Sequence, residues 1–344
     1  MGCSSSKGGA QESAVSDGGD SGDTGEGDDV GDGGGHVLLQ YPGSAFGSSV
    51  PEWVRLEPVT NASLQTLGSK LDALSPGSDQ WAGLSRDGQW VALATTRFDC
   101  QSGGCLAVAR VDGTKGSLVK SEGTTTEIDP EGRPAIASGG ALIVYPASGG
   151  PHGWDLYVVT LGASGWSAPL LLTADMEGAP DDGGAANEFA HDVGLSYDGK
   201  TAVFECGPSP YQTDGADICV TNLDGSGTRV AVSRFAGPSA VDSNYTHMPD
   251  YAPDGTVVFE ADWVPGGGSS ERIWRFTPDA GVALVTPAGI GDDNSPCVFP
   301  DGRIASLWLP NAIHELKVMN ADGSNAVMVD TTVDIDDVGQ SCGL

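Results

Sequence analysis

Short runs of apolar residues, each placed just after a tight turn, recur along most of this chain. The clearest lies in residues 195–207, LSYDGKTAVFECG, where an Asp-Gly turn precedes an unbroken apolar and β-branched segment. The phrase returns around Asp87, Asp254 and Asp301, and a weaker copy without the aspartate surrounds Gly139. Asp-Gly is a strong turn signal, and apolar runs of this length are typical of strands. The pattern therefore predicts a repeat protein built from β-strands.

The turns within each unit keep a regular spacing. The first and second turns lie 21 to 26 residues apart: Asp87 and Asp112, Asp198 and Asp224, Asp254 and Asp279, Asp301 and Asp322. Four strands then recur every 47 to 56 residues, which is typical of propeller blades and not of an ordinary β-sandwich.

Five whole units fit this spacing, and strands are left over at both ends. Three unpartnered strands begin the folded part, at residues 36–41, 52–59 and 63–69, and a single first strand, DVGQSCG, occupies residues 337–343. We expect the two sets to combine. The predicted fold is an all-β, six-bladed β-propeller of four-stranded antiparallel blades, closed by pairing of the C-terminal strand with the N-terminal strands, which removes exposed sheet edges.

The blade phrase resembles the signature of the TolB-type, WD-repeat-like β-propeller family, in which a proline and an aromatic residue precede Ser-Pro-Asp-Gly and a hydrophobic strand. Residues 249–255 and 296–302 match it best, while the units at Asp87 and Asp198 lack the proline. The resemblance covers residues 36–344 and implies a fold and envelope scaffolding, not a chemistry. The additional N-terminal domain of TolB is not found in this sequence, so the resemblance does not extend to TolB's own transport role.

Composition separates an N-terminal tether from the propeller. Residues 1–35 are a mixture of Gly, Ser, Asp and Glu without an apolar run, so we expect a disordered acidic tether. The whole chain has 16 Lys and Arg against 47 Asp and Glu, a formal net charge of -31. Such a charge repels nucleic acid and anionic lipid, and we exclude both as direct ligands.

The first residues allow two kinds of lipid anchor. Cys3 followed by serines resembles the mature start of a bacterial lipoprotein, in which the cysteine is lipidated. Gly2 and Ser6 also satisfy the myristoylation pattern, with Cys3 available for palmitoylation. An unmodified start is the third alternative.

Six further cysteines occupy positions that suit disulfides. Cys100 and Cys105 flank the loop between a second and a third strand, and Cys206 and Cys219 flank the corresponding loop two units later. Cys297 and Cys342 lie on innermost strands of neighbouring units, although the repeat offsets them by about three positions. Free buried cysteines are the alternative. Oxidised pairs would place the chain in the periplasm or outside the cell and favour the lipoprotein.

A ring of polar residues is expected at one end of the central channel. The residue seven before each Asp-Gly turn would begin an innermost strand there: Gln80, Gly132, His191, His247, Asn294 and Asp336. With Asp192, Asp250, Asp292 and Asp293 nearby, His191 and His247 are candidate ligands for a divalent metal or a polar molecule. The alternative is that these groups only satisfy strand ends and channel water.

The longest connections all fall on this same end, and loops held by a rigid scaffold commonly carry function. They contain Phe235, Tyr211, Tyr245 and Trp263, which either form a contact surface or pack within the loops.

Familiar catalytic signatures are missing, including G-x-S-x-G, H-E-x-x-H and the P-loop. We therefore expect a noncatalytic binding module without a required cofactor, a monomer that is lipid-anchored in a bacterial envelope. As an outer-membrane lipoprotein, or in the periplasm or at the cell surface, it would present the long-loop face to a protein, peptide or envelope component. The alternative is a propeller hydrolase or lyase acting on a saccharide or lactone, with His191 and His247 as metal ligands or acid–base groups.

Overall fold

The computed structural model describes residues 35–41, 50–57, 61–65, 67–121, 127–151, 153–175, 190–207, 216–237, 246–263, 271–287, 291–310, 315–329 and 341–343. These residues lie within Gly33–Leu344, which forms one compact unit. Four of the sequence predictions fall outside the described residues: the tether except Gly35, the lipidation at Cys3, the channel residue Asp336, and the loop aromatics Tyr211 and Tyr245.

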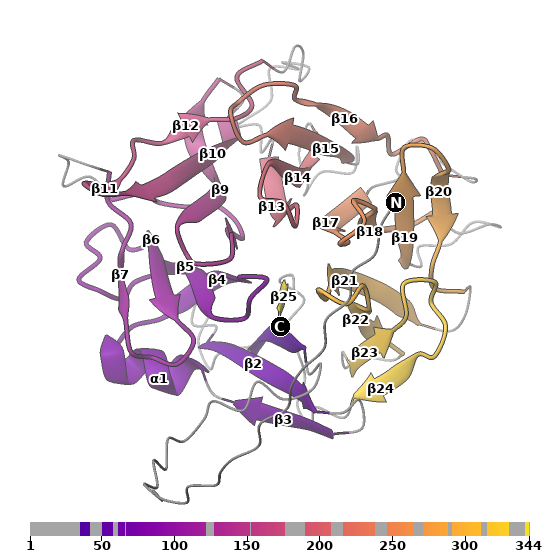
Figure 1. Ribbon diagram of the computed structural model, residues 1–344, viewed down its shortest axis with the longest axis horizontal. Coiled ribbons are helices and arrows are strands. Elements are labelled where there is room, and N and C mark those ends of the chain that lie inside the picture. The colour runs from indigo at the N-terminus through magenta and orange to yellow at the C-terminus, as the bar shows by residue number, and fades with distance from the viewer. Residues whose placement is uncertain are drawn as a thin grey trace, which may run out of the picture. The chain divides into compact units, whose positions relative to one another are not determined.

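The described unit is an all-β propeller of four-stranded antiparallel blades (Figure 1). Five sheets consist of consecutive strands, and we number them blade 1 to blade 5 in chain order. Blade 1 contains β4 (Asp79–Leu84), β5 (Trp90–Thr95), β6 (Cys105–Arg110) and β7 (Gly116–Leu118). Blade 2 contains β8 (Ala135–Ile136), β9 (Leu142–Gly150), β10 (Gly153–Gly162), β11 (Gly165–Trp166) and β12 (Leu170–Leu171).

The next three blades repeat the simple four-strand order. Blade 3 contains β13 (Ala190–Leu195), β14 (Thr201–Cys206), β15 (Asp217–Asn222) and β16 (Arg229–Val232). Blade 4 contains β17 (Thr246–Tyr251), β18 (Val257–Ala261), β19 (Arg272–Thr277) and β20 (Gly281–Leu284). Blade 5 contains β21 (Asp292–Val298), β22 (Ile304–Leu309), β23 (Glu315–Met319) and β24 (Val327–Val329).

One further sheet combines strands from both ends of the chain, and we call it the terminal sheet. Its order is β25 (Ser341–Gly343), β1 (His36–Tyr41), β2 (Val50–Glu57) and β3 (Asn61–Gln65). Cys342 of β25 lies opposite Val37 of β1 in antiparallel register. In all these sheets the innermost strand lies nearest the centre and the last strand at the periphery (Figure 1).

The Asp-Gly turns between the first two strands of a blade are built as the sequence predicts. In blade 3, Gly199 has a φ of 65°, a left-handed conformation that glycine adopts without strain. The Ser196 hydroxyl and the Lys200 amide both donate to Asp198. These hydrogen bonds lower the pKa of Asp198, so the carboxylate stays ionised and holds the turn.

One short helix departs from the sequence prediction, which ends a strand at residue 69. α1 (Leu67–Leu74) directly follows β3. Leu67 and Leu71 lie one turn apart on one helix face, both fully buried against Leu84 and Leu93 of blade 1. Burial of this face stabilises a helix too short to form alone. No helix in the described part of the chain is long and apolar enough to cross a membrane.

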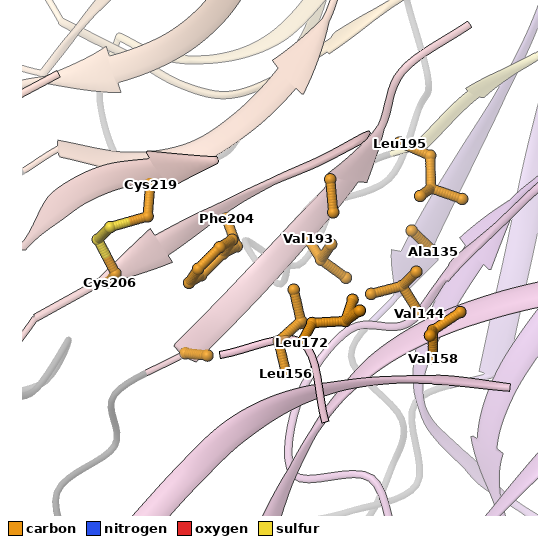
Figure 2. Close-up of a cluster of buried hydrophobic side chains, with 12 residues drawn as sticks. Ala135, Val144, Leu156, Val158, Leu172, Val193, Leu195, Phe204, Cys206 and Cys219 are labelled. Carbon is orange, nitrogen blue, oxygen red and sulfur yellow. A yellow bond between two sulfur atoms is a disulfide. The ribbon is translucent and has the colours of Figure 1, made fainter. Parts of the chain in front are cut away.

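Large apolar side chains fill the spaces between blades. Between blades 2 and 3, Val144 and Leu156 pack against Val193 and Phe204, and all four are buried (Figure 2). Full burial of such side chains contributes about 1.5–3 kcal/mol each. Each blade thus packs against a neighbouring blade on both of its faces. Both faces of its strands are therefore apolar, which explains the nearly continuous apolar runs in the sequence.

Three disulfides confirm the predicted cysteine pairs: Cys100–Cys105, Cys206–Cys219 and Cys297–Cys342, with Cα separations of 5.9, 5.8 and 5.5 Å. The third joins blade 5 to the terminal sheet. Its cysteines meet despite their offset in the repeat. Cys206–Cys219 borders the apolar cluster between blades 2 and 3 (Figure 2).

Candidate functional site

The innermost strands of blades 3, 4 and 5 each carry a β-bulge near the end at which they begin. We call this end of the propeller the mouth, and the opposite end, where the Asp-Gly turns lie, the turn face. The three bulges contain Asp192, Met248 and Ser295, with φ values of 32°, 49° and 47°. Positive φ strains residues other than glycine, and such bulges are common beside functional sites. The mouth is therefore where this regular fold departs from regularity.

His191 of blade 3 lies buried at the first bulge. Its Nδ1 is 2.6 Å from Oδ2 of the adjacent Asp192. Its ring stacks on Trp154 of blade 2, with centroids 5.7 Å apart and planes at 18°. Gly132 leaves room for the ring, because a Cβ there would come within 3.3 Å of the histidine Nε2. Contacts from blade 2 and from its own neighbour thus fix the orientation of the imidazole.

Asp192 is a buried carboxylate with two nearby cations. Arg133 Nε lies 3.7 Å from its Oδ1, and His191 contacts its Oδ2. Burial alone would raise the pKa of Asp192, but the positive charges of His191 and Arg133, with the hydrogen bond from His191, outweigh burial and lower it. The side chain is therefore held as a carboxylate.

His247 of blade 4 is joined to blade 3 through Glu205. Glu205 lies on β14 opposite His191 and is buried, and its Oε2 is 2.7 Å from Nδ1 of His247. Burial lowers the pKa of His247, but the charge of Glu205 and its hydrogen bond outweigh burial, with a smaller contribution from Asp192. The net pKa of His247 is raised, so the imidazolium is favoured.

The two predicted histidines thus belong to one inter-blade cluster. Donor atoms of His191, Asp192 and Glu205 all lie within 4.8 Å of one another, and all three residues are buried. An imidazole nitrogen with two carboxylate oxygens suits a divalent cation such as Zn²⁺ or Mn²⁺. The donor set fits a metal chemically, although binding would have to displace protons and part of the contacts from His247 and Arg133.

Blade 5 has a related arrangement without histidine. Glu260 of blade 4 lies opposite His247 in the sheet, and its Oε2 accepts a hydrogen bond from the Ser295 amide at 2.5 Å. Asn294, which begins this bulge, is buried. In both cases a second-strand glutamate of one blade meets the bulge of the next, so Glu205 and Glu260 occupy equivalent positions.

Two further predicted residues do not join the histidines. Gln80 of blade 1 is exposed, and its neighbour Asp79 carries the buried charge there. Asp79 accepts hydrogen bonds from Arg97 Nε at 3.0 and 3.1 Å, and Arg97 also binds the carbonyl of Ser75. Burial raises the pKa of Asp79, which Arg97 partly offsets. The predicted ring is therefore not continued at blade 1.

Asp250 faces the other end of the axis, where it pairs with Arg86. Arg86 extends from the first turn of blade 1 and donates to both oxygens of Asp250. It also donates to the carbonyls of Val298 and Leu195 at 2.9 and 3.2 Å and lies 4.6 Å from the centre of the Tyr197 ring. Asp250 in turn accepts the Val298 amide. One arginine thus connects blades 1, 3, 4 and 5 at the turn face.

Sequence reasoning missed Glu205, Glu260 and Arg86. A signal for the glutamates exists, because the phrase Val-Phe-Glu is repeated at residues 203–205 and 258–260, with a charge inside an otherwise apolar strand. The only sequence signal for Arg86 is its position in the Ser-Arg-Asp-Gly turn. The other units have Tyr197, Pro253 and Pro300 at that position.

The two loop aromatics that can be described have different environments. Trp263 is fully buried, donates from Nε1 to the Arg234 carbonyl at 2.8 Å, and packs edge-to-face on Phe259 and Trp274. A contact-surface role for Trp263 is thus wrong, and loop packing explains it. Phe235 is 52% exposed beside Arg234 and is available for contact.

No protein-family model and no curated protein sequence matches this chain. Solved structures do. A putative TolB from Agrobacterium tumefaciens has a TM-score of 0.55 and 16% identity over 90% of this chain and 92% of its own. TolB from Acinetobacter baumannii has a TM-score of 0.60 and 13% identity over 90% of this chain and 66% of its own.

A chain of a nidogen/laminin complex has a TM-score of 0.55 and 12% identity, over 90% of this chain and 99% of its own. At such identities the likeness concerns fold alone. By its structure, this chain is a β-propeller whose structural neighbours include the TolB β-propeller proteins.

Proposed function

We propose that this protein is a noncatalytic binding propeller that presents its mouth and the surrounding loops to a protein or another envelope component. In this proposal the terminal sheet acts as a sixth blade, and the pairing of β25 with β1 closes the ring. Closure of this kind makes a rigid platform without exposed sheet edges. The fold shared with TolB propellers supports a scaffold role of this kind.

The single observation that carries the proposal is the pairing of ionisable side chains along the axis. His191 and His247 each contact a carboxylate at 2.6–2.7 Å. Arg86 and Asp250 form an ion pair at the turn face. The ion pairs of His247 and Arg86 join blades together, and the His191 ring stacks on blade 2, whereas a general acid or base has to reach a substrate. The arrangement supports a fixed surface for recognition.

The disulfides support an oxidising compartment for the protein. Three disulfides in one chain are expected in the periplasm or outside the cell and are rare in the cytosol. Together with Cys3 near the start of the sequence, they favour a bacterial lipoprotein over a myristoylated cytosolic protein.

The binding face can be tested by site-specific photo-crosslinking in cells. A photoreactive residue placed at Phe235 samples the loops at the mouth, and one at Lys200, whose side chain is 78% exposed, samples the turn face. We expect a discrete adduct from position 235 that is not formed from position 200. Equal adducts from both positions, or an adduct from position 200 alone, would contradict the proposed face.

The anchor requires a separate measurement. Intact mass analysis of the protein from membrane fractions should show a diacylglyceryl group that Cys3→Ser abolishes, with the variant moving to the aqueous phase on detergent partitioning. The matched control is Gly2→Ala, which blocks myristoylation and should leave partitioning unchanged. The reverse result would favour the myristoylated alternative.

The donor cluster at His191, Asp192 and Glu205 favours one second candidate, a metal-dependent hydrolase or lyase acting on a saccharide or lactone. Calorimetric titration of the oxidised full-length chain with Ca²⁺, Mn²⁺ and Zn²⁺ tests it. Stoichiometric binding that is lost in a His191→Ala, His247→Ala double variant would support this candidate. Binding that is absent, or unchanged in the double variant, would eliminate it and leave the recognition surface.

A further inference from the structure

A second candidate site lies between blades 4 and 5, toward the periphery of the propeller. It is a cavity of about 310 Å³. Its lining includes Pro287, which follows the outermost strand of blade 4, and Met328 on the outermost strand of blade 5. The contact between blades 2 and 3, in comparison, is filled by apolar side chains. This cavity is within the size range of small-molecule sites.

Most of the cavity wall is apolar. Met319 is buried at its base, Met328 is 40% exposed at its edge, and Trp308 and Pro287 complete the wall. Methionine side chains adapt their shape to a bound group, and their sulfur atoms interact well with aromatic rings. The wall therefore suits a flat apolar or aromatic body.

The inner end of the cavity carries charge. Lys317 contacts Asp293, and its Nζ lies 5.8 Å from the centre of the Trp308 ring. Arg272 is buried, with Nη1 donating to the carbonyls of Glu271 and Gly291 at 2.6 Å. Two cationic side chains thus face one carboxylate.

The net charge of the residues that line the cavity is opposite in sign to the net charge of the whole chain. The protein carries a formal net charge of -31, yet the cavity has an excess of one positive charge. An anionic group on a ligand would be attracted to this end, and its attraction would be strongest for Lys317, which reaches into the cavity beside Trp308.

We propose that this cavity binds a small aromatic carboxylate. The ring would lie between Met319 and Met328 beside Trp308, and the carboxylate would bind at Lys317. The cavity lining includes neither the histidine cluster nor Phe235, so binding there can be tested separately from the metal cluster and from the proposed contact at Phe235.

Indole-3-acetate is a suitable probe, and indole-3-acetamide is its uncharged counterpart of the same size. Calorimetry and saturation-transfer NMR with the oxidised full-length protein at low salt should show saturable one-to-one binding of the acetate. We expect the acetamide to bind at least tenfold more weakly. Absence of saturable binding, or equal affinity for both probes, would overturn the proposal.

Two variants locate the site. Met328→Glu adds a carboxylate at the open edge and should weaken acetate binding at least tenfold, whereas Val230→Glu, on the equally exposed outer strand of blade 3, should leave it unchanged. Lys317→Met should remove the preference for acetate over acetamide. The thermal midpoint of each variant reports whether it folds. Acetate binding that survives Met328→Glu in full would place the probe elsewhere and contradict the assignment.

Discussion

The two ends of the central axis are built from different chemistry. At the turn face, one arginine binds Asp250 of blade 4 and one carbonyl each of blades 3 and 5. At the mouth, His191 and His247 pair with carboxylates beside bulged backbone. The turn face is thus connected by a permanent charge, whereas the mouth is connected through imidazole rings, whose charge depends on protonation.

The backbone differs in the same way. The turns at the turn face adopt positive φ at glycine, as at Gly88 and Gly199, where it costs little. The mouth places Asp192, Met248 and Ser295 at positive φ, where it costs of order 1–3 kcal/mol each. Strain of this kind persists only where surrounding contacts hold it. The comparison assigns the turn face a stabilising role, and the proposed function assigns recognition to the mouth.

The largest expected effect comes from breaking the charge pair at the turn face. Arg86→Ala leaves the buried carboxylate of Asp250 without its cation, which should lower the free energy of unfolding by about 3–5 kcal/mol. Urea denaturation measures this loss. Arg110→Ala, which breaks the exposed pair with Asp112, is the control and should cost less than about 1 kcal/mol. Similar losses in both variants would contradict a special role for Arg86.

The disulfide between blade 5 and the terminal sheet should be the next largest contribution. β25 sits against the first turn of blade 1, since a Cβ on Gly343 would meet the Ser85 carbonyl at 2.6 Å. Replacing Cys297 and Cys342 by serine opens a loop between residues 45 positions apart and should cost about 4 kcal/mol by loop entropy.

The matched control for this disulfide is the pair Cys100–Cys105, which spans only 5 positions. Its replacement by serines should cost about 2 kcal/mol on the same model. Unfolding midpoints of the two double variants give the ranking. A larger loss from the short loop would show that the long-range connection does not hold the ends of the propeller.

The mouth should make stability depend on pH through His247. Its pKa in the folded protein is raised above the ordinary 6.5, because Glu205, with Asp192 and Glu271, outweighs burial. A raised folded pKa gives stability that is fully present below pH 6.5 and is lost as pH rises through the folded pKa. We therefore expect the free energy of unfolding to fall across that range.

Two variants isolate this contribution. His247→Gln removes the titrating group and Glu205→Gln removes its main partner, so both should flatten the fall in stability above pH 6.5 relative to wild type. Urea denaturation at several pH values measures the slope. A slope unchanged in both variants would assign the pH dependence to other groups.

The sequence predicts the repeated part of the fold because each turn carries its own signal. Asp198 and Gly199 define a turn whose geometry needs no information from other blades, and the apolar run after it fills a gap between sheets. Two of the disulfides follow from the same repeat, since both cysteines flank one loop, whereas Cys297 and Cys342 are offset in the repeat. α1 escaped prediction because its eight residues depend on tertiary burial of Leu67 and Leu71.

The candidate site could be predicted only in part. Alignment to the turns placed His191 and His247 at the same end of the channel. In the structure Glu205 contacts His247 and lies in one group with His191 and Asp192. The same alignment could not assign Asp250, because the bulge between His247 and Asp250 turns that carboxylate toward Arg86. Bulges change which way a side chain faces, and although Pro249 and Pro296 mark two of them, a proline does not show where the neighbouring side chains point.

The smallest effects should come from the turn aspartates, and they distinguish contacts within a blade from contacts between blades. Asp87 accepts from Ser85 and Gln89 in its own turn and from the Gly139 amide of blade 2 at 2.8 Å. Asp198 is held only by its own turn among the described contacts. Asp87→Ala should therefore cost about 1 kcal/mol more than Asp198→Ala in urea denaturation, the value of one hydrogen bond. Equal costs would mean that the Gly139 contact contributes nothing and that blade 1 and blade 2 are joined by apolar packing alone.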